Sequence, residues 1–159
     1  MYVEYVAALP EAVLELANQL GTDKVVVTGH SLGGAIATLC AQYLSDYIPN
    51  VVTYTFGSPR VGDYLFADLF NITISNSYRV VNKDDIVPHL PYYDVDKFHH
   101  VPRELWFYEG GAGPYVECSL SGEDKSCADS IPTVLFSVHV IIFLYILLIS
   151  KGSPYIFRH

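Results

Sequence analysis

One stretch of the sequence, VVVTGHSLGGAIATL at residues 25–39, constrains the fold more than any other. Three β-branched apolar residues at 25–27 come first, and the small residues around a single serine at 29–33 follow them. Apolar residues then recur at helical spacing over 35–40. This order predicts a strand that passes through one tight turn directly into a helix.

The turn has the pattern G-x-S-x-G, which suits a serine nucleophile. Ser31 would stand above the end of the strand, and Gly29 and Gly33 would relieve the crowding that such a turn causes. The following helix would aim its first amides at the site, so the amide of Leu32 is the expected oxyanion donor. We expect His30, inside the turn, to pack or hydrogen-bond locally without transferring a proton.

A serine hydroxyl needs a histidine base and a carboxylate that orients the base. In folds with this turn the chain order is serine, acid, histidine, each on a loop after a strand. Asp84 and Asp85 follow the apolar segment YRVVN, and His99 and His100 come just before ELWFYE. The sequence therefore offers two candidates for each partner of Ser31.

Apolar patterning along the chain predicts alternating helices and strands. The expected helices are 3–20, 32–46 and 62–70, the expected strands are 24–28, 51–56, 77–82 and 104–109, and 84–94 is a loop. Strands that alternate with helices indicate a parallel sheet of the α/β class. The strands are apolar enough that we expect helices to cover both faces.

Charge and histidine spacing argue against nucleic-acid binding and against a metal site. The chain has 159 residues, enough for one domain, and a formal net charge of −8. Such an acidic chain repels phosphate backbones, so nucleic acid is not an expected partner. None of the six histidines has metal-ligand spacing, so we predict no metal site. The sequence leaves the oligomeric state open.

Three features bear on the compartment of the protein. Cys118 and Cys127 flank a polar loop and are positioned to form a local disulfide, whereas Cys40 is expected to pack in a helix. Asn71 begins the triplet Asn-Ile-Thr, a glycosylation sequon. Both features favour the secretory pathway, although residues 1–20 read as an amphipathic helix rather than a signal peptide.

The C-terminal residues 131–149 form a nearly continuous apolar block, followed by Lys151 and Arg158. Its length is borderline for a membrane span, which needs about 20 apolar residues. Three readings stay open: a membrane anchor, a buried element, or a tail from a mispredicted reading frame.

Four segments together resemble the class 3 lipases, the fungal-lipase-like family of α/β-hydrolases. They are VVVTGHSLGGAIATL, TFGSPRVGD, YRVVNKDDIVPHLP and HHVPRELWF, and they occur in the family's order over residues 25–107. The cysteine-bearing segment CSLSGEDKSCADS is similar to one that follows in many members. The resemblance implies an α/β-hydrolase fold with a mostly parallel sheet.

The resemblance also implies which aspartate is the acid and which histidine is the base. The family's acid lies in a D-x-V-P motif, which here selects Asp85, with the adjacent Asp84 as the alternative. The family's base precedes a glutamate by four residues, and counting back from Glu104 gives His100, with His99 as the alternative. The implied triad is therefore Ser31, Asp85 and His100.

Members of this family hydrolyse carboxylic esters, typically acylglycerols at a lipid interface, without a cofactor. The family places a second oxyanion donor and a lid before the serine turn, and this chain has little sequence there. Residues 1–130 therefore resemble the C-terminal portion of a lipase domain, with 131–159 as a hydrophobic tail. An alternative is a catalytically silent lipase-like protein that binds or scaffolds.

Overall fold

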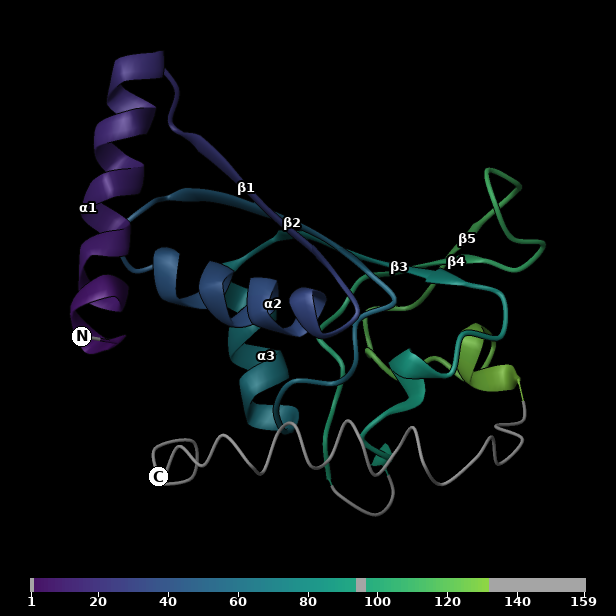
Figure 1. Cartoon of the computed structure of the whole chain (residues 1–159). Coiled ribbons are helices and arrows are strands. Elements are labelled where there is room, and N and C mark those ends of the chain that lie inside the picture. The colour runs from purple at the N-terminus through teal and green to yellow at the C-terminus, as the bar shows by residue number, and fades with distance from the viewer. Residues whose placement is uncertain (1, 94–96, 132–159) are drawn as a thin grey trace.

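A computed structural model describes residues 2–93 and 97–131 of the chain. Its centre is a five-stranded sheet in the order β1-β2-β3-β4-β5 (Figure 1). The first four strands run parallel and β5 runs antiparallel to β4. The strands are β1 (Lys24–His30), β2 (Asn50–Phe56), β3 (Asn76–Asn82), β4 (Glu104–Phe107) and β5 (Val116–Glu117). The parallel α/β fold predicted from the sequence is confirmed.

Three α-helices connect or precede these strands. They are α1 (Tyr2–Leu20), α2 (Leu32–Leu44) and α3 (Tyr64–Thr73), and two short 3₁₀ turns follow, η1 (Val87–His89) and η2 (Ala128–Ser130). In Figure 1, α2 and α3 lie on the same side of the sheet. The core between them contains Ala41 and Leu44 of α2, Ala67 and Phe70 of α3, and Val51 of β2.

The opposite face of the sheet differs from the expectation that helices cover both sides. Val25 and Val27 of β1 pack toward the core, whereas Val26 between them is 52% exposed. On β2, Tyr54 and Phe56 are 39% and 42% exposed on that same open side. Within the described residues, Figure 1 shows no helix over this face. The expectation of two covered faces is therefore wrong for the part of the chain that the structure describes.

Element boundaries follow the sequence prediction to within three residues. Strand β1 continues to His30, directly against the serine turn, because it pairs with β2 along its whole length. Strand β5 was not predicted; Val116–Glu117 is short and pairs with Leu105–Trp106. The apolar block 131–149 lies outside the described residues apart from Ile131. Among the helices that the structure describes, none is long and apolar enough to cross a membrane.

Candidate active site

Ser31 occupies the turn between β1 and α2 in a strained backbone conformation. Its φ and ψ are 54° and −128°, a region that residues other than glycine rarely adopt. Its amide donates to the carbonyl of Phe56 at 2.9 Å, which fixes the turn to the end of β2. Strain of this kind persists where the surrounding structure enforces it, and it marks functional turns.

Close contacts require two glycines around Ser31: Gly29, as the motif suggests, and Gly34, which lies outside the motif. A Cβ on Gly29 would lie 2.1 Å from the carbonyl oxygen of Gly33, and one on Gly34 would lie 2.8 Å from Cβ of Ser58. A Cβ on Gly33 would meet nothing within 4 Å. The sequence argument that Gly33 relieves crowding is therefore wrong: its backbone approaches Gly29, and Gly34 has the tight contact.

This contrast predicts a large loss of stability for one of two matched substitutions and a small change for the other. Gly29→Ala forces Cβ into a backbone carbonyl, so we expect it to lower the free energy of unfolding by about 3 kcal/mol. Gly33→Ala adds a methyl group in open space near the start of a helix, so we expect a change within about 1 kcal/mol. Urea unfolding followed by circular dichroism measures both variants, and equal losses would contradict the geometry.

The backbone at the start of α2 supplies hydrogen-bond donors beside Ser31. Leu32 is the first helical residue, and the amides of a first helical turn have no acceptor within the helix. The first amide that turns back is that of Gly34, which donates to the carbonyl of Ser31 at 2.8 Å. The amide of Leu32 has no acceptor within the described residues and could donate to an oxyanion, and its role as the oxyanion donor stays a prediction.

Asp85 lies at the carboxyl end of the parallel strands, next to the serine turn. Its Oδ1 accepts from the amide of Val87 at 3.0 Å. Its Oδ2 lies 2.6 Å from the point that a Cβ of Gly57 would occupy, and Nε2 of His30 lies 3.9 Å from that same point. Gly57 follows Phe56, the residue that holds the amide of Ser31. Ser31 and Asp85 thus approach the end of β2 from its two sides.

The structure separates the two candidate acids. Asp85 is half-buried against Gly57, whereas Asp84 is exposed. A catalytic acid must hold its carboxylate in a fixed position within the site. The arrangement favours Asp85, as the resemblance implied.

The ring of His100, the histidine that the resemblance implies as the base, hydrogen-bonds to a backbone carbonyl. The ring is 3% exposed, and its Nε2 hydrogen-bonds to the carbonyl oxygen of Pro88 at 2.6 Å. Within the described residues, no hydrogen bond joins this ring to Ser31 or Asp85. Burial, with the positive charges of Arg79 and Arg60 nearby, holds the pKa of His100 well below its usual range.

The lowered pKa of His100 predicts a pH-dependent stability. The unfolded chain binds a proton at this residue near pH 6.5 and the folded chain does not, so stability falls as the pH drops below that value. The loss from this one group is at most about 1.4 kcal/mol per pH unit. We expect His100→Gln to remove this part of the slope, measured by urea unfolding between pH 5 and 7.5. An unchanged slope would show that His100 is protonated when folded.

The rings of His99 and His89 also have partners of their own. Nε2 of His99 hydrogen-bonds to the carbonyl of Ser121 at 2.7 Å, and its ring contacts Tyr64 and Tyr93 at the edge of an open pocket of about 290 Å³. Nδ1 of His89 lies 3.3 Å from a carboxylate oxygen of Asp129.

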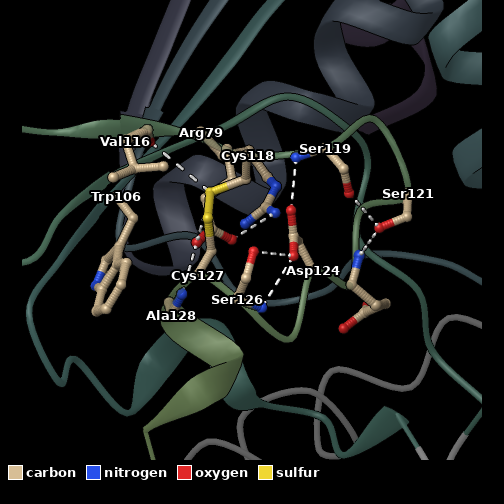
Figure 2. The surroundings of a disulfide bond; sticks show 12 residues. Arg79, Trp106, Val116, Cys118, Ser119, Ser121, Asp124, Ser126, Cys127 and Ala128 are labelled. Carbon is tan, nitrogen blue, oxygen red and sulfur yellow. Dashed lines mark hydrogen bonds and ion pairs between the residues drawn. A yellow bond between two sulfur atoms is a disulfide. The ribbon is translucent and has the colours of Figure 1, made fainter.

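The predicted disulfide between Cys118 and Cys127 is present and closes a polar loop (Figure 2). Inside the loop the carboxylate of Asp124 accepts from Ser126 and from the amide of Ser119, at 2.7 Å in each case. These hydrogen bonds, first that of the Ser126 side chain, lower the pKa of Asp124. The disulfide sulfurs also lie near Glu104, but sulfurs joined to each other supply no thiolate for a metal.

Sequence reasoning missed a buried ionic network under this loop. Arg79 donates from Nη2 to Glu104 at 3.0 Å and from Nε to the carbonyl of Val101 at 2.6 Å. Arg60 forms a two-point pair with Glu123, at 2.8 Å from Nε and 2.6 Å from Nη2. Sixty-three residues separate Arg60 from Glu123, and no local pattern signals such a pairing.

Two further predicted features lie outside this cluster. Asn71 is exposed on α3, where the glycosylation assignment stays a prediction. Cys40 lies on α2 next to the core, and burial raises the pKa of its thiol. A half-buried thiol with a raised pKa is a packing residue rather than a nucleophile.

Comparison with known proteins supplies the family context of this arrangement. The family model described as Lipase (class 3) matches residues 1–95. The chain is 39% identical over 135 residues to a lipase of Rhizomucor miehei, and 42% identical over 134 residues to secreted mono- and diacylglycerol lipase 1 of Fusarium solani. It also resembles a solved triacylglycerol lipase whose catalytic centre is a serine protease triad, with a TM-score of 0.69 at 38% identity.

These alignments cover most of this chain but only part of its relatives. They span 82% and 83% of the chain, but 37% of the Rhizomucor and 38% of the Fusarium protein. The structural match covers 82% of this chain and 50% of the solved lipase. The chain thus spans less than half the length of these two curated relatives.

Proposed function

Because this chain belongs to the class 3 lipase family, we propose that it carries the serine turn of a serine ester hydrolase that acts on acylglycerol-like lipids. One observation carries the proposal: Ser31 is strained at the end of β1, beside free helix amides and across Gly57 from Asp85. A turn of this shape exposes a serine hydroxyl to a substrate carbonyl. The relatives named as lipases support the substrate class.

The proposed reaction is a two-step acyl transfer. Ser31 Oγ attacks the ester carbonyl, a histidine takes the hydroxyl proton, and the oxyanion accepts a hydrogen bond from the amide of Leu32. The histidine returns the proton to the departing alcohol, and water releases the fatty acid by the same steps. Asp85 would hold the imidazole in the tautomer that accepts the serine proton.

Histidine replacement identifies the base of this triad. The resemblance assigns it to His100, and that assignment stays a prediction; the ring of His100 hydrogen-bonds to Pro88 in this structure. His139 and His159 lie outside the described residues. Replacing each of the six histidines in turn by Ala and by Gln identifies the base, because a base tolerates neither change.

A catalytically silent, lipid-binding protein is the second candidate. The open apolar face at Val26, Tyr54 and Phe56 favours it, since exposed apolar patches commonly mark interaction sites. The strained backbone of Ser31 argues against it, because such strain lowers stability and is typical of active sites.

Turnover separates the two candidates. The purified chain is mixed with p-nitrophenyl butyrate and with a triacylglycerol emulsion, and released product and emulsion-bound protein are both measured. We expect product from both substrates. If the chain bound the emulsion but released product no faster than Ser31→Ala, the silent protein would be supported instead.

Similarity to secreted lipases also supports a proposal about location. The Fusarium relative is named as secreted, and the Cys118–Cys127 disulfide is stable in an oxidising compartment. We therefore place the whole protein in the secretory pathway or outside the cell.

A further inference from the structure

The loop that follows Asp85 is held at two points by side chains from other parts of the chain. Residues 86–91 leave Asp85 through the η1 turn, in which the amide of Val87 donates to Asp85 Oδ1 at 3.0 Å. The carbonyl of Pro88 accepts from His100 Nε2 at 2.6 Å, and that of Pro91 accepts from Arg60 Nη1 at 3.0 Å. The carbonyls of Pro88 and Pro91 are thus each held by a buried side chain.

The two holding residues are themselves joined by one carboxylate. Glu123 accepts from Nε and Nη2 of Arg60, at 2.8 and 2.6 Å, and its Oε1 also accepts from the backbone amide of His100 at 2.8 Å. Arg60 and His100 are 6% and 3% exposed. Glu123 lies within the loop that the Cys118–Cys127 disulfide closes.

The partner of the His100 ring fixes which nitrogen carries the proton. A carbonyl oxygen only accepts, so Nε2 of His100 must be the donor toward Pro88. The ring is neutral because burial and the charges of Arg79 and Arg60 lower its pKa, so Nδ1 carries no proton. A base for Ser31 needs the opposite tautomer, with a proton on Nδ1 toward the acid and a lone pair on Nε2.

From this geometry we propose that His100 is a positioning residue: with Arg60 and Glu123 it clamps residues 86–91 and so fixes the carboxylate of Asp85 against Gly57, at the end of β2 to which the Ser31 turn is also bonded. This proposal rests on the proposed function, because the position of the loop affects catalysis only if Asp85 is the acid of the triad. It acts through Val87, whose amide is adjacent to the held Pro88.

The replacement of His100 by Gln or Ala distinguishes a clamp from a base. A Gln amide nitrogen can take the place of Nε2 and donate to Pro88, but it cannot accept and return a proton as a base does. With a clamp, His100→Ala lowers kcat/KM about 100-fold, mostly in kcat, and His100→Gln restores at least tenfold of that loss. Equal losses of 1,000-fold or more in both variants would overturn the proposal.

Nuclear magnetic resonance of the wild-type chain provides a readout independent of activity and of variant folding. We expect long-range nitrogen–proton spectra to show His100 as the Nε2-protonated tautomer, unchanged between pH 5.5 and 8. An Nδ1-protonated ring would contradict the clamp. If the wild-type chain proved inactive, the proposed function would fail for this chain, and the tautomer would still decide the role of His100.

The Glu123 end of the clamp has a matched control in the same region. Glu123→Gln weakens the two-point pair with Arg60. Glu117→Gln instead removes the charge of a side chain that is 60% exposed and lies 3.8 Å from Nε of Arg103. We expect Glu123→Gln to lower kcat about tenfold with little change in KM, and Glu117→Gln to leave both unchanged. The same loss in both variants would show that charge alone, not the clamp, is responsible.

Discussion

Replacement of Ser31 by Ala lowers ester hydrolysis by a factor on the order of 10⁵ to 10⁶, because it removes the atom that attacks the carbonyl. This factor corresponds to about 7–8 kcal/mol of transition-state stabilisation. The fold should persist, since Ala occupies the same turn with a smaller side chain. Initial rates on p-nitrophenyl butyrate, with circular dichroism of both proteins, measure the effect.

The control for this variant is Ser130→Ala, which changes an exposed serine after the disulfide. We expect its rate to equal that of the wild type. A Ser31→Ala protein that is folded and retains a tenth or more of the wild-type rate would rule out Ser31 as the nucleophile.

The second large effect separates the two adjacent carboxylates. Asp85→Asn keeps the size of the side chain but removes the charge that orients the base and stabilises its protonated form, so we expect kcat to fall about 10⁴-fold. Asp84→Asn alters an exposed carboxylate and should leave kcat close to that of the wild type. Steady-state kinetics of the two variants, prepared side by side, decide between the positions.

The reverse outcome would be informative as well. If Asp84→Asn were the inactive variant, the acid would lie one residue earlier than the contact with Gly57 indicates. The account of the loop after β3, including the role of Val87, would then be wrong.

The features that the sequence predicted well are elements of the fold made of consecutive residues. The turn at Ser31 depends on its immediate neighbours, so β1, the turn and α2 could all be read from residues 24–44. The choice of Asp85 came from a short motif in the same way, and its position against Gly57 supports it. Even here the motif pointed to Gly33, whereas the tight contact is at Gly34. That contact is with Ser58, 24 positions along the chain, so the local pattern could not show it.

The parts that sequence could not predict depend on long-range contacts. Spacing from Glu104 identified His100 as a candidate, but nothing in that spacing shows that its ring meets Pro88. The pair of Arg60 with Glu123 is equally invisible in the sequence. An apolar strand such as residues 25–27 reads alike whether one face or both are covered, so the exposure of Val26 could not be foreseen.

The measurement that tests the central claim most directly is fluorophosphonate labelling of the purified chain. Such probes react with a serine only where its hydroxyl is activated and an oxyanion donor is in place. We expect a single labelled peptide containing Ser31, with no labelling of Ser31→Ala and strongly reduced labelling of Asp85→Asn. A folded chain that stays unlabelled, or that is labelled equally in Ser31→Ala, would contradict the claim that this turn forms a serine hydrolase site.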